Sequence, residues 1–352
     1  MSGEGYQERD RYQIDQSRSC GDRVCFLGSR PGRLCSAATH DPTEMSQDRI
    51  VTVTVPATTA NLGPGFDCLG AALSLYNRFT FSQSEALRIT ATGAEAEQVA
   101  LDQTNLAYQA FEQLYKAIGQ SAPSVHLAIQ LGVPLARGLG SSATAIVGGL
   151  LGANALAGSP LSQADVLALA IALEGHPDNV VPALVGGCQL TVSASDGPLV
   201  CPIPWHSDIA PVLAIPNFEL STQMARDVLP AHYSLNAAVF TASRVGLLVR
   251  GLETGQPQWL EAALQDDLHQ PHRKALIPGY DDLHQAAIDA GAYGLVISGA
   301  GPTLLAMAHP VAVAQVAEAL TKAWQTQNIT AEVICPTLNQ VGAQAEMLDS
   351  AP

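Results

Sequence analysis

Hydrophobic and polar positions divide the chain into short alternating segments and longer segments with helical spacing. Clean alternation over Ile50–Val55 predicts a half-buried strand that ends at Pro56, and Leu73–Phe81 is its expected hairpin partner. Apolar residues recur with a helical period after Thr104, which predicts an amphipathic helix. Further short apolar runs predict the remaining strands, which are Val125–Ile129, Val212–Ile215, Gly294–Ser298, Leu304–Ala308 and Ala331–Cys335.

The other predicted helices begin at recognisable start signals. Ser162 and Asp165 have the spacing of a capping box, and Pro177 suits the first turn of a helix. Helices are therefore predicted after Gly140, from Ser162, from Pro177, and over Leu235–Arg250, Pro257–Leu268 and Pro310–Trp324. Together with the strands they predict an α+β fold, whose C-terminal part follows the β-α-β-β-α-β order of a ferredoxin-like domain.

The pattern changes at two places along the chain. Residues 1–45 lack apolar periodicity and are rich in arginine and acidic residues, which predicts a disordered extension. Met45 directly precedes the first ordered segment, so we expect it to be the natural start. Three prolines between positions 198 and 204 predict a crossing between an N-terminal domain, 46–204, and a C-terminal domain, 205–345.

Composition narrows the classes of partner. The 352 residues carry a formal net charge of −15, which argues against nucleic acid or an anionic membrane as a partner. The seven cysteines are scattered without a CxxC pair or metal-binding spacing, as expected of reduced thiols in the cytoplasm. The charge does not exclude ATP, because a single helix N-terminus can bind phosphate on an acidic protein.

A glycine-rich loop leads into the alanine-rich segment after Gly140. The unpaired N–H groups and positive dipole at a helix start favour an anion, and hydroxyls such as that of Ser142 can bind phosphate or a metal ion. A dinucleotide-binding loop needs a strand directly before its first glycine, but Pro134 and Arg137 interrupt that position. A P-loop is excluded because no lysine follows the glycines, and a simple helix cap remains the plainest alternative.

The segment from Pro134 to Ala143 resembles the phosphate-binding motif Pro-x-x-x-Gly-Leu-Gly-Ser-Ser-Ala of the GHMP kinases. Asn105-Leu106 is similar to the Asn-Leu pair of that family, whose asparagine lies near the adenine, although Asn105 also suits a plain helix start. The resemblance implies ATP-binding residues Asn105, Pro134, Leu135, Ala136, Arg137, Gly138, Leu139, Gly140, Ser141, Ser142, Ala143 and Thr144.

Four other segments are similar to the homoserine kinases within this family, and they lie at 56–70, 174–183, 220–230 and 298–303. In the first, Asn61 and Asp67 are implied to contact an amino-acid substrate. In the second, Glu174 is implied to hold Mg²⁺ together with Ser142, and Asn179 stands where related kinases carry a catalytic aspartate. Arg226 and Arg273 form the implied pair for the substrate carboxylate, which a guanidinium binds bidentately.

The resemblance implies a GHMP kinase fold, with an N-terminal domain like ribosomal protein S5 domain 2 and a ferredoxin-like C-terminal domain. It implies transfer of phosphate from ATP, with Mg²⁺, to the hydroxyl of L-homoserine in threonine biosynthesis. Asn179, Glu174 and Ser142 are the implied catalytic residues, and Asn61, Asp67, Asn179, Arg226 and Arg273 the implied substrate-binding residues. Two alternatives are a kinase for another small alcohol, such as mevalonate, and a non-catalytic ligand-binding protein of this fold. The proton acceptor and the oligomeric state stay open, with a homodimer as one candidate.

Overall fold

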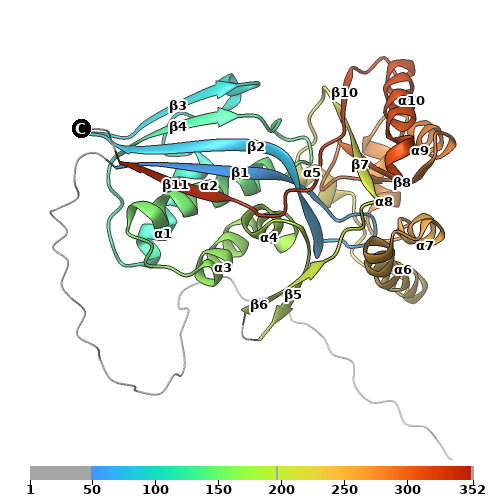
Figure 1. The fold of residues 1–352 in the computed structure, drawn as a ribbon, viewed down its shortest axis with the longest axis horizontal. Helices are drawn as coiled ribbons and strands as arrows, with labels where there is room; N and C mark the ends of the chain where they lie inside the picture. Colours follow the sequence, from blue (N-terminus) through green and yellow to red (C-terminus); the bar gives the residue numbers. More distant parts are fainter. Residues whose placement is uncertain (1–48, 196, 350–352) are drawn as a thin grey trace, which may run out of the picture. The chain divides into compact units, whose positions relative to one another are not determined.

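The computed structural model describes residues 49–195 and 197–349, which belong to one compact unit. The predicted disordered extension, 1–45, and the predicted start at Met45 lie outside the described residues. Two β-sheets organise the described part of the chain, one of seven strands and one of four (Figure 1). None of the helices in these two ranges is long and apolar enough to cross a membrane.

The seven-stranded sheet has the order β11-β1-β2-β4-β3, and β5 and β6 form a hairpin attached to β2. All pairs are antiparallel except β3 with β4, which run parallel. Its strands are β1 (Arg49–Ala60), β2 (Leu69–Gln83), β3 (Arg88–Gly93), β4 (Val125–Leu131), β5 (Cys188–Ala194), β6 (Gly197–Ile203) and β11 (Gln344–Asp349). The predicted hairpin of the first two strands is confirmed.

The first strand does not end at Pro56, as the sequence predicts, but continues to Ala60. Pro56 still pairs with Tyr76 of β2, and the register then shifts before Thr58. An irregularity of this kind accommodates a residue that has no N–H for the ladder. The extension matters for the site, because it carries the strand directly into the loop that holds Asn61.

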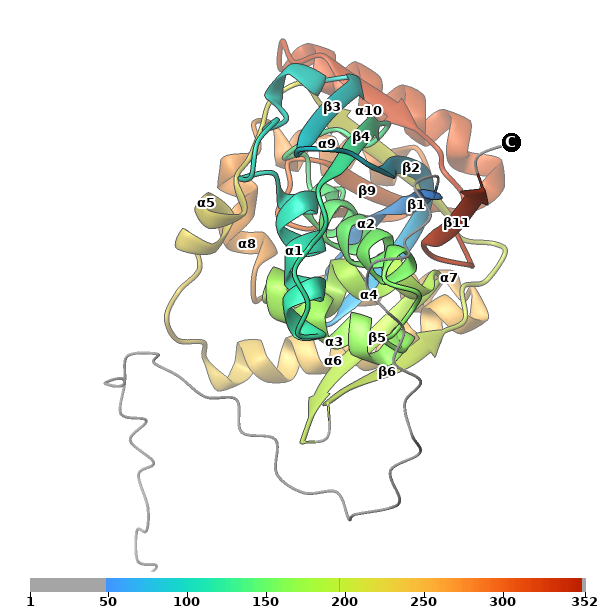
Figure 2. The same ribbon diagram turned by 90° about the vertical axis from the view of Figure 1, so that its left-hand side faces the viewer.

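Helices α1 to α4 lie together against this sheet (Figures 1 and 2). They are α1 (Leu106–Ala117), α2 (Ser141–Leu156), α3 (Gln163–Glu174) and α4 (Pro177–Val185), and η1 (Ala96–Gln98) is a 3₁₀ turn. The apolar residues of α2 cover all its sides because it contacts the other three helices as well as β1. Phe79, Phe81, Phe111 and Leu150 are among the residues of this core.

The four-stranded sheet has the order β10-β7-β9-β8 with every pair antiparallel. Together with the intervening helices, this sheet confirms the predicted ferredoxin-like β-α-β-β-α-β arrangement. Both faces are covered: Val212 and Ala214 of β7 belong to a core with α9 and α10, whereas Leu213 and Ile215 belong to a core with α6 and α7. The strands are β7 (Ala210–Pro216), β8 (Ala292–Ile297), β9 (Leu304–Ala308) and β10 (Ala331–Ile334).

The remaining helices connect these strands. They are α5 (Thr222–Asp227), α6 (Leu235–Thr254), α7 (Pro257–Ala263), α8 (Gln270–Arg273), α9 (Tyr280–Asp289) and α10 (Val313–Thr326), with 3₁₀ turns η2 (Lys274–Leu276) and η3 (Pro310–Ala312). The helix predicted over Pro257–Leu268 ends earlier because the Asp266 carboxylate accepts hydrogen bonds from the N–H groups of residues 268–270. Such local side-chain bonds compete with a continuing helix.

β3, β5, β6, β11, α5, α8 and α9 were not predicted from the sequence. Two of the prolines that predict a crossing lie within β6, where an edge strand tolerates them because the outward N–H needs no partner. The chain passes to the second sheet only after Ile203. β11 is held by pairing with β1 from the far end of the chain, and a local pattern does not reveal that kind of contact.

Candidate active site

One pocket gathers polar side chains from segments far apart in the sequence. It is formed by the loop after β1, the glycine loop before α2, the start of α4, the segments around α5 and α8, and the loop between β8 and β9. Its lining residues are Asn61, Asp67, Ala136, Gly138, Gly140, Ser141, Ser142, Glu174, His176, Asp178, Asn179, Leu220, Thr222, Arg226, Arg273, Gly299 and Ala300. The structure therefore brings together every predicted metal-binding and substrate-binding residue.

The glycine loop begins α2 as predicted, but its glycines are needed for a reason that the sequence does not show. Gly138 and Gly140 have φ values of 75° and 67°, which side chains rarely adopt. A Cβ on Gly140 would collide with the hydroxyl of Thr58, and one on Gly138 with the carbonyl of Ser298. Protein atoms thus occupy the space that a side chain at either position would need.

The predicted ATP-binding residues separate into two groups, apart from Pro134, which is half-buried and lines neither pocket. Asn105, Leu135, Ala136, Gly138, Gly140, Ser141 and Ser142 line pockets. By contrast, Leu139, Ala143 and Thr144 are buried in the protein. Arg137 is buried too, and its guanidinium donates to Glu95 and to the carbonyls of Leu135 and Pro216. Its charge is therefore committed to holding the loop, so the sequence-based expectation of a phosphate contact has no support from its geometry.

Ser142 and Glu174 form a hydrogen-bonded pair in this pocket. The Ser142 hydroxyl donates to Oε1 of Glu174 over 2.6 Å. Burial raises the pKa of the Glu174 carboxyl, while the Ser142 hydrogen bond and nearby His176 oppose that rise. Two adjacent hard oxygen ligands match the donor set that Mg²⁺ prefers, and the role of this pair in binding the ion stays a prediction.

A second, mostly apolar pocket adjoins the first at Ser141 and Ser142, which line both. Its other lining residues are Asn77, Phe79, Gln98, Val99, Ala100, Thr104, Asn105, Leu106, Ala107, Ile129, Leu131, Leu135 and Ala145. The Asn105 side chain accepts from the N–H groups of Ala107 and Tyr108, so it caps α1, which begins two residues later than predicted. The plain helix-start interpretation of Asn105 is correct, and the residue also lies in the pocket.

The loop after β1 is held by its own polar side chains. Asn61 Oδ1 accepts from the Asp67 N–H at 3.0 Å, and Nδ2 donates to the carbonyl of Gly299 at 2.8 Å. The first role of this amide is thus to fix the loop. The Asp67 carboxylate receives two hydrogen bonds from the Arg226 guanidinium, at 2.8 and 3.1 Å. The structure pairs these two charges with each other, which the sequence analysis does not foresee.

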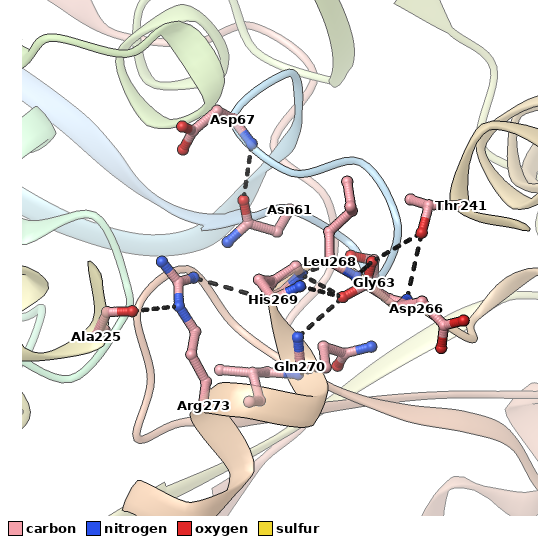
Figure 3. A network of polar contacts seen from close by, with 12 residues as sticks. Asn61, Gly63, Asp67, Ala225, Thr241, Asp266, Leu268, His269, Gln270 and Arg273 are labelled. Atoms are coloured by element: carbon pink, nitrogen blue, oxygen red, sulfur yellow. Dashed lines mark hydrogen bonds and ion pairs between the residues drawn. The ribbon is translucent and has the colours of Figure 1, made fainter. Parts of the chain in front are cut away.

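Arg273, a neighbour of Arg226, is held by backbone carbonyls, and Figure 3 shows its guanidinium next to Ala225. Its Nε donates to the carbonyl of Ala225 at 2.9 Å, and Nη1 donates to that of Gly299 at 3.1 Å. The guanidinium lies 5.1 Å from the Phe66 ring centroid, over which Arg226 also lies, at 5.7 Å. Burial and the neighbouring Arg226 lower the pKa of Arg273. Two cations thus share one aromatic platform, an arrangement that suits an anionic ligand group.

His176 and Asp178 complete the pocket, and the sequence analysis assigns neither of them a role. Nδ1 of His176 lies 2.5 Å from the buried carboxylate of Asp178. Burial alone would lower the pKa of His176, but the hydrogen bond and charge of Asp178 raise it above the ordinary value. Asn179 accepts from the Thr58 hydroxyl at 2.8 Å. The sequence feature that could have identified His176 and Asp178 is the cluster of polar residues from Glu174 to Asn179.

Comparison with known proteins places this geometry in a family. The family pattern described as "GHMP kinases N terminal domain" matches residues 105–187, and "GHMP kinases C terminal" matches 248–326. A homoserine kinase from Trichodesmium erythraeum is 61% identical over 296 residues, which cover 83% of this chain and 97% of that protein. One from Nostoc sp. is 62% identical over 301 residues, covering 85% and 100%. The chain belongs to the homoserine kinase family of GHMP kinases.

Solved structures agree with this family. A homoserine kinase from Cytophaga hutchinsonii superposes with a TM-score of 0.77 at 31% identity, covering 89% of this chain and all of that one. Streptococcus pneumoniae phosphomevalonate kinase, at 15% identity and a TM-score of 0.61 over 81% and 99% of the two chains, shares the fold alone. The predicted GHMP kinase fold is therefore confirmed, and the protein is a kinase.

In this homoserine kinase family member, the site holds a carboxylate–hydroxyl pair, a helix N-terminus and two guanidinium groups around one pocket. The first two features can stabilise phosphate, and the third can bind a carboxylate. The residue at 179 is an asparagine, whose amide cannot accept a proton as a carboxylate would. The arrangement is suited to transfer of a phosphoryl group by positioning and charge stabilisation.

Proposed function

We propose that the protein transfers the γ-phosphoryl group of ATP to the hydroxyl of L-homoserine, giving O-phospho-L-homoserine in threonine biosynthesis. One observation carries this proposal above the others. Two adjoining pockets meet at Ser141 and Ser142, and one is mostly apolar while the other holds three carboxylates and two guanidinium groups. A nucleoside triphosphate and a small zwitterionic alcohol fit such a pair of pockets, with the phosphoryl group passing between them.

The nucleotide is assigned to the apolar pocket. Its base would lie near Asn105 at the start of α1, and its phosphates would reach the first turn of α2. The backbone N–H groups of that turn have no intrahelical partners, and the positive end of the helix dipole favours phosphate. In this assignment Arg137 acts by fixing the loop, since its hydrogen bonds lead to Glu95 and backbone carbonyls.

Ser142 and Glu174 are the proposed ligands of Mg²⁺. Their oxygens, 2.6 Å apart, lie where the two pockets adjoin, so they could hold an ion beside the phosphates. Bound Mg²⁺ would supply neutralisation of the charge on the transferred phosphoryl group. The raised pKa of Glu174 is consistent with a buried carboxylate that gains stability when a cation is bound.

Binding of L-homoserine would break the Asp67–Arg226 ion pair and form two new ones with the substrate. Its ammonium would take the place of Arg226 beside Asp67, and its carboxylate would bind Arg226 and Arg273. The Asp67 and Arg226 side chains are 34% and 36% exposed, so they can part more readily than a buried pair. Neither mevalonate nor another alcohol without an ammonium offers a partner for Asp67. This complementarity favours an amino-acid substrate over the mevalonate-like alternative.

Asn179, with Asn61 nearby, is proposed to hold the substrate hydroxyl in line for transfer. The Asn179 amide is oriented by the Thr58 hydroxyl, so it presents a fixed group to the pocket. A loose transition state demands alignment and charge stabilisation more than a strong base, which is compatible with the missing aspartate. Ser142, Glu174 and Asn179 are accordingly the proposed catalytic residues.

Three broader expectations belong to the same proposal. We propose that 46–204 acts as an ATP-binding domain and 205–345 as a second domain. The two separate sheets support this division, except that β11 returns to the first sheet from Gln344 onward. A cytoplasmic location follows from the proposed biosynthetic role and the use of ATP. A homodimer is the candidate assembly, and sedimentation of the purified protein would test it.

A coupled ADP-release assay tests the proposed activity. The substrates to compare are L-homoserine, L-serine, L-threonine, mevalonate and shikimate, each with ATP and Mg²⁺. We expect turnover with L-homoserine to exceed that with any other alcohol by at least about 10²-fold. Each of the other compounds either lacks one of the charged groups or holds its hydroxyl at a different distance from them. Preferred use of mevalonate would support the alternative alcohol kinase, and no turnover with any of them would support a non-catalytic protein.

A further inference from the structure

His269 is a fully buried histidine behind the substrate pocket and outside its lining. It lies immediately before α8, the short helix that carries Arg273. Figure 3 shows its ring between the loop of Gly63 and the Arg273 side chain. The imidazole therefore contacts two segments that the proposed function assigns to the substrate.

The partners of the two ring nitrogens determine the tautomer. Nε2 lies 2.7 Å from the carbonyl oxygen of Gly63, which can only accept, so Nε2 must carry the hydrogen. Nδ1 lies 3.5 Å from Nη1 of Arg273, which can only donate, so Nδ1 must present its lone pair. One donor and one acceptor make the ring neutral. A proton on Nδ1 would point at a guanidinium.

The surroundings of the ring agree with this neutral form. Burial is the largest cause that lowers the pKa of His269, and Arg273 acts in the same direction. The charge of Asp266 and the Gly63 carbonyl oppose the shift, as does Asp67 more weakly. The Asp266 carboxylate is occupied with the N–H groups of residues 268–270, so it fixes the backbone of His269.

The ring also stacks on Phe66, with centroids 5.1 Å apart and planes at 26°. Phe66 is the platform under both arginines, and it directly precedes Asp67. The imidazole is thus linked to the 61–67 loop through the Gly63 carbonyl and the Phe66 ring, and to Arg273 through Nδ1. It therefore bridges the proposed ammonium site and the proposed carboxylate site.

We propose that His269 is a positioning residue whose neutral Nε2–H imidazole fixes the 61–67 loop relative to Arg273 and thereby sets the affinity for L-homoserine. This inference rests on the proposed function, because it concerns the two groups assigned to the substrate zwitterion. His269 should affect the binding of L-homoserine and not the phosphoryl-transfer step. Among the described residues, it forms no hydrogen bond with the glycine loop or with the Ser142–Glu174 pair.

The kinetic test compares His269→Phe, His269→Gln and the control His272→Gln. Phenylalanine keeps a ring on Phe66 but leaves the Gly63 carbonyl and the Arg273 N–H without their partner. We expect His269→Phe to raise the KM for L-homoserine about tenfold or more, with kcat and the KM for ATP within about threefold of wild type. His269→Gln keeps an N–H donor for Gly63 and should recover most of the loss. His272→Gln, on the same helix, should behave as wild type.

Several results would overturn this inference. Equal changes in kcat and both KM values for His269→Phe, with no recovery in His269→Gln, would indicate a structural role alone. An unchanged KM for L-homoserine would remove the proposed link to affinity. If wild type does not use L-homoserine, the proposed function itself fails, and the two failures are thereby distinguished.

A spectroscopic test needs no substitution and no substrate. Long-range ¹H–¹⁵N NMR of the wild-type protein labelled at histidine should show one ring in the neutral Nε2–H form near neutral pH, and His269→Gln should remove that signal. If the signal that His269→Gln removes belongs instead to a ring protonated at Nδ1, alone or together with Nε2, the assigned hydrogen bonds are wrong and the inference with them.

Discussion

The two adjoining pockets differ in whether their polar groups already have hydrogen-bond or ion-pair partners within the protein. On the nucleotide side, Ser141 and Ser142 open the first turn of α2, next to a mostly apolar surface. On the substrate side, Asp67 and Arg226 neutralise each other, and Arg273 donates to two backbone carbonyls. The nucleotide side is ready to receive an anion, whereas the substrate side must first exchange internal partners.

This difference indicates where selectivity arises. A helix N-terminus accepts any suitably shaped phosphate, so the nucleotide side favours a class of ligand. In the proposed exchange, the Asp67–Arg226 pair opens only for a ligand that offers both a cation and an anion at the right separation. A zwitterionic amino acid meets that condition, and a simple alcohol or acid leaves one charge unpaired.

The largest effect is expected at the point where the pockets adjoin. Glu174→Gln keeps the size of the side chain but removes the charge that would hold Mg²⁺ beside Ser142. We expect kcat to fall by about 10²-fold or more, on the scale of losing a transition-state charge stabiliser. Steady-state kinetics over a range of Mg²⁺ would measure it, with Glu253→Gln on the surface of α6 as the control. An unchanged kcat at saturating Mg²⁺ would refute the metal-ligand assignment.

Asp67→Asn should affect the substrate side alone. Loss of a charged partner costs about 2–5 kcal/mol, so the KM for L-homoserine should rise about 30-fold or more while ATP affinity is kept. The free energy of unfolding should change by less than about 1 kcal/mol, because the pair is about one-third exposed. Kinetics and urea unfolding of the same variant separate the two effects. A large stability loss without a change in KM would make the pair structural.

Gly140→Ala should affect the nucleotide side. Its φ of 67° costs a side chain about 1–2 kcal/mol, and its Cβ would also push Thr58 away from Asn179. Gly158→Ala is a matched control, because its φ is 82° but nothing lies within 4 Å of the added Cβ. Both variants should lose stability, and only Gly140→Ala should bind ATP more weakly in calorimetry. Equal ATP affinities would mean that the loop is only a helix cap.

The smallest effect concerns the pH dependence of stability. Asp178 raises the pKa of His176 in the folded protein, so this ring holds its proton more tightly in the folded protein than in the unfolded chain. Protonation of His176 therefore stabilises the fold. This contribution is fully present below the ordinary value of 6.5 and is lost as the pH rises through the raised folded value. Urea unfolding across that window should therefore show a decline that His176→Gln lacks. Parallel curves for the two proteins would contradict the assignment.

Local patterns and motif resemblance predicted the part of the site that a single segment determines. The glycine loop and the helix start after Gly140 are as expected, because helix starts and short motifs act over a few residues. Ser142 and Glu174 are 32 positions apart, and only the resemblance predicted that they lie together. The Asp67–Arg226 pair was not predicted, because its partners are 159 positions apart and each resembled a substrate contact. For the same reason the analysis missed β11, whose position depends on pairing with β1.

The resemblance to the family also assigned ligand contacts to residues whose side chains hold loops in the structure. Arg137 lies within the phosphate-binding motif, yet its side chain holds the loop through Glu95. Asn61 lies within the substrate motif, yet its amide first fixes the 61–67 loop. His176 and Asp178 stand between two assigned residues and received no role, although they line the pocket. A motif identifies a segment, and only the fold shows which of its side chains face the ligand.

The exchange of the Asp67–Arg226 pair for a bound zwitterion is the central claim, and a substrate–enzyme cycle tests it most directly. Wild type and Arg226→Gln are each assayed with L-homoserine and with 3-aminopropan-1-ol, which lacks the carboxylate. Wild type should lose about 30-fold or more in kcat/KM on the change of substrate, whereas Arg226→Gln should lose much less, since one interaction cannot be removed twice. If the two losses multiply instead, Arg226 does not bind the substrate carboxylate, and the proposed exchange of ion pairs is wrong.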